Sequence, residues 1–160
     1  MIGIMADSHD NLPAIKKAVR LFKDAGCELV IHAGDFIAPF AARELEALDC
    51  PVKAVFGNCD GEKKGLEKAL ASFGEVKKEP FVFSHKGRKY YLAHVPADLK
   101  RHAASGQYDV IVFAHTHSPE IQKKGKTLIV NPGEAGGWVS GKSTVALVDT
   151  ETLSAEILPL

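Results

Sequence analysis

The stretch VIVFAHTH (residues 110–117) runs from four apolar residues, through a single alanine, into two closely spaced histidines. The apolar run predicts a buried strand, and the histidines come where that strand should end. The same order recurs four more times, with an apolar run followed by Asp7 and His9, by Gly34 and Asp35, by Gly57 to Asp60, and by His94. The recurrence indicates one plan, in which buried strands carry polar side chains at their carboxyl ends.

In the first half of the chain, the segments between these runs have helical patterns. A capping Asn11 and an early Pro13 start a helix whose apolar residues repeat at helical spacing until Gly26 ends it. Residues 39–48 and 62–73 predict two further helices. The helices alternate with short strands at 2–6, 29–31 and 52–56. This order predicts a largely parallel sheet.

The second half changes to hairpins, with one more helix at 97–105. Paired apolar segments flank short turns at 81–84 with 89–93, 121–123 with 127–130, and 144–148 with 155–158. Parallel units followed by hairpins predict two sheets with helices outside them. We therefore expect an α/β fold formed by a single domain over residues 1–160.

Composition restricts the classes of function. The chain has 160 residues, 46% of them hydrophobic and 25% charged, with a formal net charge of zero. No overall field therefore favours nucleic acid or an acidic membrane. The first residues, MIGIMADSHD, lack the basic start of a signal peptide, and no apolar run approaches the roughly 18 residues that span a bilayer. Cys27, Cys50 and Cys59 form no CxxC pair, so a disulfide framework is not expected, and we predict a cytoplasmic protein.

The polar residues at the strand ends form a set with metal-ligand chemistry. Ligands of open α/β sheets bind at the carboxyl ends of the strands, so these side chains should converge on one rim. A single Asp or His after a strand is usually a cap or a packed residue, but the whole set is hard to explain in that way. It is too large for one tetrahedral ion and suits two ions that share a carboxylate, an arrangement that hydrolyses phosphate esters. The seven residues are Asp7, His9, Asp35, Asn58, His94, His115 and His117.

With these blocks in this order, the chain resembles the calcineurin-like metallophosphoesterase superfamily, and within it the small YfcE-type phosphodiesterases. The resemblance covers nearly the whole chain. The matching blocks are D-x-H at 7–9, G-D at 34–35, G-N-x-D at 57–60, the strand-end His94, G-H-x-H at 114–117 with Ala114 for the glycine, and N-P-G at 131–133. The family fold is a four-layer α/β/β/α sandwich with two mixed β-sheets, which agrees with the two sheets expected above.

The resemblance also implies roles for the ligands. It assigns Asp7, His9 and His117 to one metal ion, Asn58, His94 and His115 to a second, and Asp35 to a bridge between them. It implies two divalent ions, with Mn2+ as the first choice and Ni2+, Fe2+ or Zn2+ as alternatives. The implied function is a phosphodiesterase that attacks a small phosphodiester with a metal-bridging hydroxide. Substrate contacts are expected at Asn58, Asn131 and Gly133, and homo-oligomers occur in the family.

The chain departs from the superfamily pattern at the position of the usual proton donor. Many members have G-N-H-D with an Asp partner for that His, whereas Cys59 and Ala38 occupy these positions here. The remaining catalytic candidates are Asp60 and Cys59, and Asp60 is expected rather to orient its loop. His94 is followed by Val95 and Pro96 in place of Gly-His, which removes one expected phosphate contact.

Two other functions of the same fold stay open. One is a phosphomonoesterase or nucleotidase, and the other is a catalytically silent protein-interaction scaffold like the retromer subunit that resembles this family. Two further residues have two interpretations each. His32 either supports the metal ligands or is simply packed, and Trp138 either packs under the site or offers a stacking face.

Overall fold

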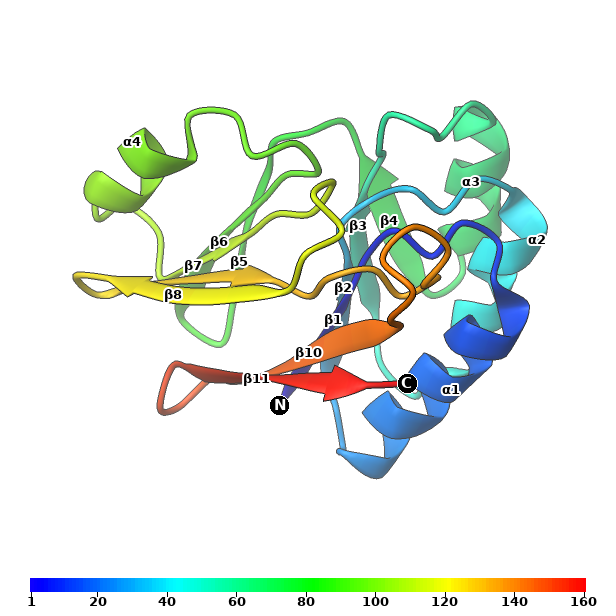
Figure 1. The fold of residues 1–160 in the computed structure, drawn as a ribbon, viewed down its shortest axis with the longest axis horizontal. Coiled ribbons are helices and arrows are strands. Elements are labelled where there is room, and N and C mark those ends of the chain that lie inside the picture. Colours follow the sequence, from blue (N-terminus) through cyan, green and yellow to red (C-terminus); the bar gives the residue numbers. More distant parts are fainter.

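The first β-sheet combines the N-terminal half of the chain with its last two strands (Figure 1). The computed structural model describes residues 1–160. Strand order is β11-β10-β1-β2-β3-β4, with β1 to β4 parallel, β10 antiparallel to β1, and β11 antiparallel to β10. The strands are β1 (Ile2–Met5), β2 (Leu29–His32), β3 (Val52–Val55), β4 (Gly74–Lys77), β10 (Thr144–Asp149) and β11 (Ser154–Pro159).

The second sheet contains the strands of the middle of the chain. Its order is β5-β6-β7-β9-β8, with β6, β7 and β9 parallel and the two edge strands antiparallel to their neighbours. The strands are β5 (Phe81–His85), β6 (Arg88–Leu92), β7 (Val110–Val112), β8 (Glu120–Lys124) and β9 (Thr127–Asn131). Both sheets are therefore mixed, as the sequence predicts.

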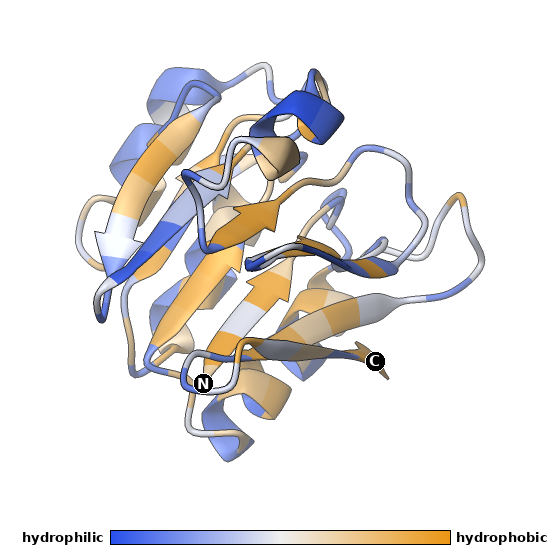
Figure 2. Ribbon diagram, turned by 90° about the vertical axis from the view of Figure 1, so that its left-hand side faces the viewer, coloured by the Kyte–Doolittle hydropathy of each residue, from blue (hydrophilic) through white to orange (hydrophobic).

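Helices cover the outer face of each sheet (Figure 1). The first sheet is covered by α1 (Leu12–Asp24), α2 (Pro39–Ala42), the 3-10 helix η1 (Arg43–Ala47) and α3 (Lys63–Leu70), and the second by α4 (Leu99–Ala104). A cluster of 17 buried residues, among them Ile4 and Val112, lies between the sheets. Two further clusters lie between the helices and the sheets, and Figure 2 shows apolar strands inside with more polar helices outside. This is the four-layer α/β/β/α sandwich that the sequence predicts.

The packing of α1 on β1 shows how the sequence produces these layers. Asn11 caps α1 by accepting a hydrogen bond from the Ala14 N–H at 3.2 Å, as the sequence suggests. Phe22, fully buried, lies flat on β1 over Gly3, where any Cβ atom would come within 2.6 Å of the Phe22 ring. A side chain at residue 3 would therefore push the helix away from the sheet.

The structure corrects the sequence prediction at three helices and one strand. The helix expected over 39–48 ends as α2 at Ala42 and continues as η1, and the helix expected over 62–73 is α3, ending at Leu70. The helix expected over 97–105 is the shorter α4. Strand β4 was not predicted, because Val76 is the only strongly apolar residue in its sequence GEVK. As an edge strand, it carries charged residues that would not suit a central one.

None of the helices combines the length and the apolar character needed to cross a bilayer.

Candidate metal centre

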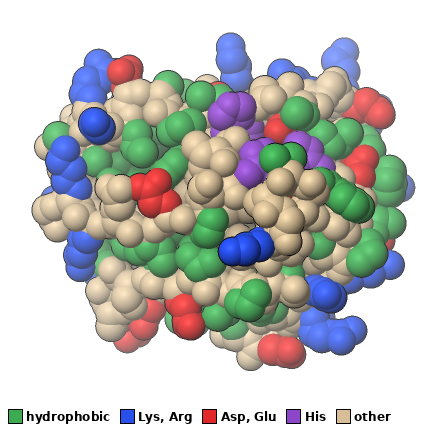
Figure 3. Space-filling model, viewed as in Figure 1, with side chains coloured by type: hydrophobic (Ala, Val, Ile, Leu, Met, Phe, Trp, Pro, Cys, Tyr) green, Lys and Arg blue, Asp and Glu red, His purple; other side chains and the backbone are tan.

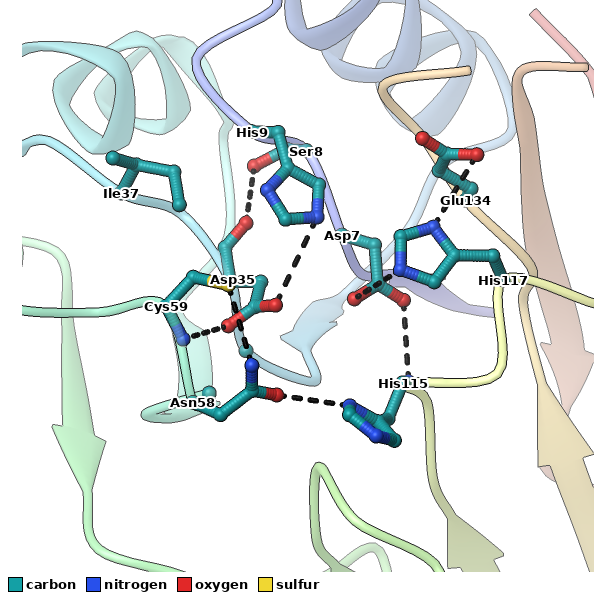
Figure 4. Close-up of polar contacts among 12 residues, drawn as sticks. Asp7, Ser8, His9, Asp35, Ile37, Asn58, Cys59, His115, His117 and Glu134 are labelled. Atoms are coloured by element: carbon teal, nitrogen blue, oxygen red, sulfur yellow. Dashed lines mark hydrogen bonds and ion pairs between the residues drawn. The ribbon is translucent and has the colours of Figure 1, made fainter. Parts of the chain in front are cut away.

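The predicted ligands come from both sheets and meet at a shared edge (Figure 4). Three loops follow the parallel strands β1, β2 and β3 of the first sheet, and two follow β6 and β7 of the second. The rim is therefore built where the carboxyl ends of two packed sheets coincide, not along the edge of a single sheet. The structure brings together all the ligands that the sequence predicts.

One group of donors converges on the amide oxygen of Asn58. Asn58 Oδ1 lies 2.8 Å from His94 Nε2 and 2.8 Å from His115 Nδ1. His94 Nδ1 lies 2.8 Å from the Ala33 carbonyl oxygen, which can only accept, so the neutral ring carries its proton on Nδ1. The lone pair of Nε2 then faces Asn58 Oδ1. Two acceptor atoms this close to one another repel unless a cation binds to both, so His94 Nε2 and Asn58 Oδ1 fit as ligands of one metal ion.

A second group consists of Asp7, His9 and His117, whose ligand atoms lie within 4.8 Å of one another. His117 Nε2 is 3.9 Å from Asp7 Oδ1. Three atoms of these residues, Asp7 Oδ1, His9 Nε2 and His117 Nδ1, are buried and have no hydrogen-bond partner. Buried polar atoms normally have partners, and a metal ion would satisfy Asp7 Oδ1 and His9 Nε2. These donors therefore fit the first ion that the resemblance implies.

Asp35 lies between the two groups. Its Oδ2 is 3.8 Å from His9 Nε2 and 3.5 Å from His94 Nε2, and its Oδ1 accepts a hydrogen bond from the Cys59 N–H at 2.8 Å. The carboxylate is 2% exposed. One oxygen thus faces an imidazole from each group, which is the position that a bridging carboxylate requires.

The electrostatics of the site favour bound positive charge. Burial raises the pKa of Asp7, and the neighbouring Asp35 carboxylate raises it further, although three nearby imidazoles act in the opposite direction. Two neighbouring buried carboxylates cost free energy unless a cation compensates them. Divalent ions would supply that compensation.

Asp60 joins the loops that carry the ligands. It is buried, and its carboxylate accepts hydrogen bonds from the backbone N–H groups of Gly57 at 2.7 Å, Ile37 at 2.8 Å and Asp35 at 3.0 Å. Both oxygens are therefore engaged by the backbone. This arrangement suits the loop-orienting role expected for Asp60 better than a role as proton donor.

His32 lies beneath the same loops and is fully buried. Its Nδ1 accepts a hydrogen bond from the Gly34 N–H at 3.2 Å, so Nε2 carries the proton and donates to Ser8 Oγ at 3.0 Å. Burial and two neighbouring imidazoles hold the pKa of His32 well below its usual value. The neutral ring connects the D-x-H loop to the G-D turn, which favours the supporting interpretation over simple packing.

Two glutamates that the sequence analysis missed support individual histidines. Glu79 accepts hydrogen bonds from the backbone N–H groups of His94 and Val95, the latter at 3.0 Å. Glu134 is fully buried, and its Oε2 lies 3.3 Å from His117 Nδ1. Burial acts to raise the pKa of Glu134, but backbone and side-chain hydrogen bonds and the His117 contact lower it to about 2. The only signal in the sequence was the position of Glu134 directly after the N-P-G block.

The N-P-G block supports the loop of the paired histidines rather than facing a substrate. Asn131 is fully buried, its Nδ2 donates to Thr116 Oγ1 at 2.9 Å, and its Oδ1 accepts from the Gly133 N–H at 2.9 Å. The substrate contacts expected at Asn131 and Gly133 do not fit this arrangement, because their polar groups are already used within the protein. Asn58, in contrast, is exposed at the rim.

Comparison with known proteins identifies the family. Residues 1–153 match the calcineurin-like phosphoesterase superfamily domain. The chain belongs to the calcineurin-like phosphoesterase superfamily. Its membership, its fold class and its assignment as a hydrolase of phosphoric esters were all expected from the sequence and are confirmed.

Within this superfamily, the chain is similar to named phosphodiesterases. It is 36% identical to phosphodiesterase MJ0936 of Methanocaldococcus jannaschii over 154 residues, which cover 94% of this chain and 93% of the relative. It is 29% identical to phosphodiesterase YfcE of Escherichia coli over 167 residues, which cover 93% of this chain and 87% of the relative. These similarities confirm a YfcE-type member of the superfamily.

Solved structures of the superfamily fold superpose on the whole chain. A structure described as a novel archaeal phosphodiesterase superposes with a TM-score of 0.94 at 34% identity and covers 99% of both chains. Vps29 of Chaetomium thermophilum superposes with a TM-score of 0.71 at 18% identity, covering 99% of this chain and 95% of that one. The second likeness is one of fold alone.

Proposed function

We propose that this metallophosphoesterase is a dinuclear phosphodiesterase. The observation that carries the proposal is the position of Asp35, whose Oδ2 faces His9 on one side and His94 on the other. Asp7, His9 and His117 would then hold one ion, Asn58, His94 and His115 would hold the second, and Asp35 would contribute to both. Bound there, the ions would supply a hydroxide as nucleophile and positive charge that stabilises the transition state.

The residues of the chain determine what else can act on the substrate. The Oδ1 of Asn58 faces the two imidazoles, and its Nδ2 donates to Cys59 Sγ at 3.3 Å. The second N–H of Nδ2 is left to donate to a phosphate oxygen. The carboxylate of Asp60 is engaged by three backbone N–H groups, and a thiol such as that of Cys59 is a weak donor. The departing oxygen therefore receives no proton from a strong acid of the protein. Aryl diesters, whose leaving groups need no such proton, should be hydrolysed much faster than alkyl diesters.

The native metal and the substrate class can be tested together. The protein is stripped of metal, its content is measured after reloading with Mn2+, Ni2+, Fe2+ or Zn2+, and each form is assayed on mono-, di- and cyclic phosphoesters. We expect two ions per chain and the highest activity with Mn2+ on aryl phosphodiesters. Asp35→Asn should abolish hydrolysis, whereas Asp49→Asn, whose side chain is 79% exposed, should not change it.

The same experiment distinguishes the other two functions. Faster hydrolysis of monoesters than of diesters would indicate a phosphomonoesterase or nucleotidase. Two bound ions with no hydrolysis of any phosphoester would indicate a silent scaffold of the kind that shares this fold.

We further propose that the protein acts in the cytoplasm, where thiols stay reduced. All three cysteines are free, which supports that location. The homo-oligomer that the family resemblance allows is tested by the molar mass of the metal-loaded protein in solution.

A further inference from the structure

Two exposed apolar residues form the tip of a loop next to the candidate metal centre. Trp138 is 67% exposed and Val139 is 75% exposed, more than any other large hydrophobic residue of the chain. Figure 3 shows histidine side chains gathered at one place on the surface, with apolar side chains beside them. Large apolar side chains at full exposure cost free energy and often mark a binding site.

This tip is attached to the loop that carries Asp7 and His9. The indole Nε1–H of Trp138 donates to the His9 carbonyl oxygen at 3.2 Å, and the Gly136 N–H donates to the Asp7 carbonyl oxygen at 3.0 Å. The side chain of Asn11 donates to the Gly136 carbonyl oxygen at 2.7 Å. The indole is therefore held by its nitrogen against the backbone of a predicted metal ligand, while most of its surface remains open.

Glu134 attaches the same tip to a second ligand. Its carboxylate accepts hydrogen bonds from the backbone N–H groups of Val139 at 2.9 Å and Ser140 at 2.7 Å, and Oε2 lies 3.3 Å from His117 Nδ1. One buried carboxylate thus holds the loop by hydrogen bonds and lies within ion-pair distance of an imidazole of the centre. The tip cannot shift relative to the metal centre without breaking these contacts.

We propose that Trp138 and Val139 form a subsite for an aromatic ester group of the substrate. The inference rests on the phosphodiesterase function proposed above. When a phosphodiester occupies the metal centre, the ester group that stays on phosphorus would extend along the rim, where this tip is fixed. A flat aromatic group would stack on the indole and remove apolar surface from water.

A second copy of the chain is a poorer occupant of this surface. A stable interface takes about 20 to 30 residues from each partner. The tip offers two large apolar residues, followed by the polar exposed residues Ser140 and Lys142. Its size suits one ring of a small molecule better than a protein.

Fluorescence offers a direct test, because Trp138 is the only tryptophan in the chain. Zn2+-loaded protein is titrated with diphenyl phosphate and, separately, with dimethyl phosphate. We expect diphenyl phosphate to shift the emission to shorter wavelength in a saturable way and dimethyl phosphate to leave it unchanged. Unchanged emission at diphenyl phosphate concentrations that inhibit hydrolysis would overturn the proposal. Emission that instead shifts with protein concentration would also overturn it, by assigning Trp138 to self-association.

Kinetics with two substrates that share a leaving group provide the second test. Bis(4-nitrophenyl) phosphate and methyl 4-nitrophenyl phosphate differ only in the ester group that stays on phosphorus. Trp138→Ala should raise KM about tenfold for the first substrate and less than about twofold for the second, with kcat nearly unchanged. A tenfold change corresponds to about 1.4 kcal/mol, which is within the range expected for loss of one stacking contact. Trp138→Phe should recover most of the loss, and Val82→Ala, at an exposed position on β5, should have no effect.

The outcomes separate this inference from the function on which it rests. Wild-type protein that hydrolyses both diesters, with equal changes in KM for both substrates in Trp138→Ala, would reject the subsite and keep the phosphodiesterase. Wild-type protein that hydrolyses neither diester in any metal form would reject the phosphodiesterase itself.

Discussion

Replacing Asp60 by Asn distinguishes a residue that positions the metal ligands from one that donates a proton. The substitution keeps the shape of the side chain but turns one acceptor oxygen into an NH2 group. That group would face at least one backbone N–H, because the two oxygens together accept from Gly57, Ile37 and Asp35. A donor would then oppose a donor in a buried site.

The magnitude follows from these hydrogen bonds. A hydrogen bond to a charged group contributes about 1.5 to 3 kcal/mol, and a buried N–H left without a partner costs a similar amount. Asp60 is 2% exposed, so water cannot replace the lost acceptor. We expect the free energy of unfolding of the metal-free variant to fall by about 3 kcal/mol. Because the Asp35 N–H is one of the groups held, metal affinity should fall about 10- to 100-fold.

Urea unfolding of the metal-free protein gives the first quantity, and calorimetric titration with Mn2+ gives the second. Asp49→Asn is the matched control, since Asp49 is exposed and pairs only with Lys23, and its effect should stay below about 0.5 kcal/mol. At saturating metal, the kcat of Asp60→Asn should recover most of its wild-type value. Wild-type stability and metal affinity together with a kcat lowered at least about 100-fold would refute the positioning role and make Asp60 the general acid.

Three other perturbations have defined outcomes. Gly57→Ala would place a Cβ atom against the carboxylate and the backbone nitrogen of Asp35, so the metal affinity measured by calorimetry should fall at least about tenfold. Gly61→Ala is the control: an added Cβ atom there meets nothing within 4 Å, and the metal affinity should not change. Mn2+ at about 100 times its dissociation constant should stabilise the folded state by about 2.7 kcal/mol and raise the midpoint of thermal unfolding by about 5–10 °C. An unfolding midpoint that is the same with and without Mn2+ would contradict a metal site in the folded protein. The salt bridges of Glu75 with two neighbouring lysines lower its pKa, so their stabilisation is present above its unfolded value of 4.5 and is lost as pH falls through the folded value. Because the side chain is 35% exposed, Glu75→Gln should cost only about 0.5 kcal/mol in urea unfolding at pH 7. The cost should shrink as the pH is lowered below 4.5, and a cost that stays constant over that range would exclude the ion pairs as its cause.

The position of each ligand could be predicted because it directly follows its own apolar run. His115 and His117 follow β7 in the chain, and Asp35 follows β2, so the strand pattern alone locates them. The pairing of strands across the chain gives no such local signal. Strand β1 pairs with β10, more than a hundred residues away, and this pairing decides which sheet each strand joins. A rim made by two sheets was therefore not predictable from the pattern of runs.

The contacts that the supporting residues make could not be predicted for a related reason. Glu79 reaches the backbone of His94 from 15 residues away, and Asp60 reaches that of Asp35 from 25 residues away. Each contact depends on how two loops fold against one another. The loop-orienting role of Asp60 was expected from its place in the G-N-x-D block, but its contact with the Asp35 loop was not. Glu79 has no distinctive neighbour in the sequence. Asn131 was recognised within its block, but its burial, and so its structural role, depends on the same loop packing.

The backbone of the ligand loops explains why these supports matter to the function. Several ligands have a positive φ, a conformation that costs a non-glycine residue on the order of 1 kcal/mol: Asp7 (49°), His9 (42°), Asp35 (60°), His115 (69°) and His117 (57°). The loops hold one another in this state, because the N–H groups of Asp7 and His9 donate to the carbonyl oxygens of Gly34 at 3.0 Å and Asp35 at 3.1 Å. The strain turns successive side chains toward one point, which regular strand or helix geometry would not do. Since each strained loop relies on its neighbour, loss of one support should weaken ligands on the other loop as well, and the donors should behave as one cooperative unit.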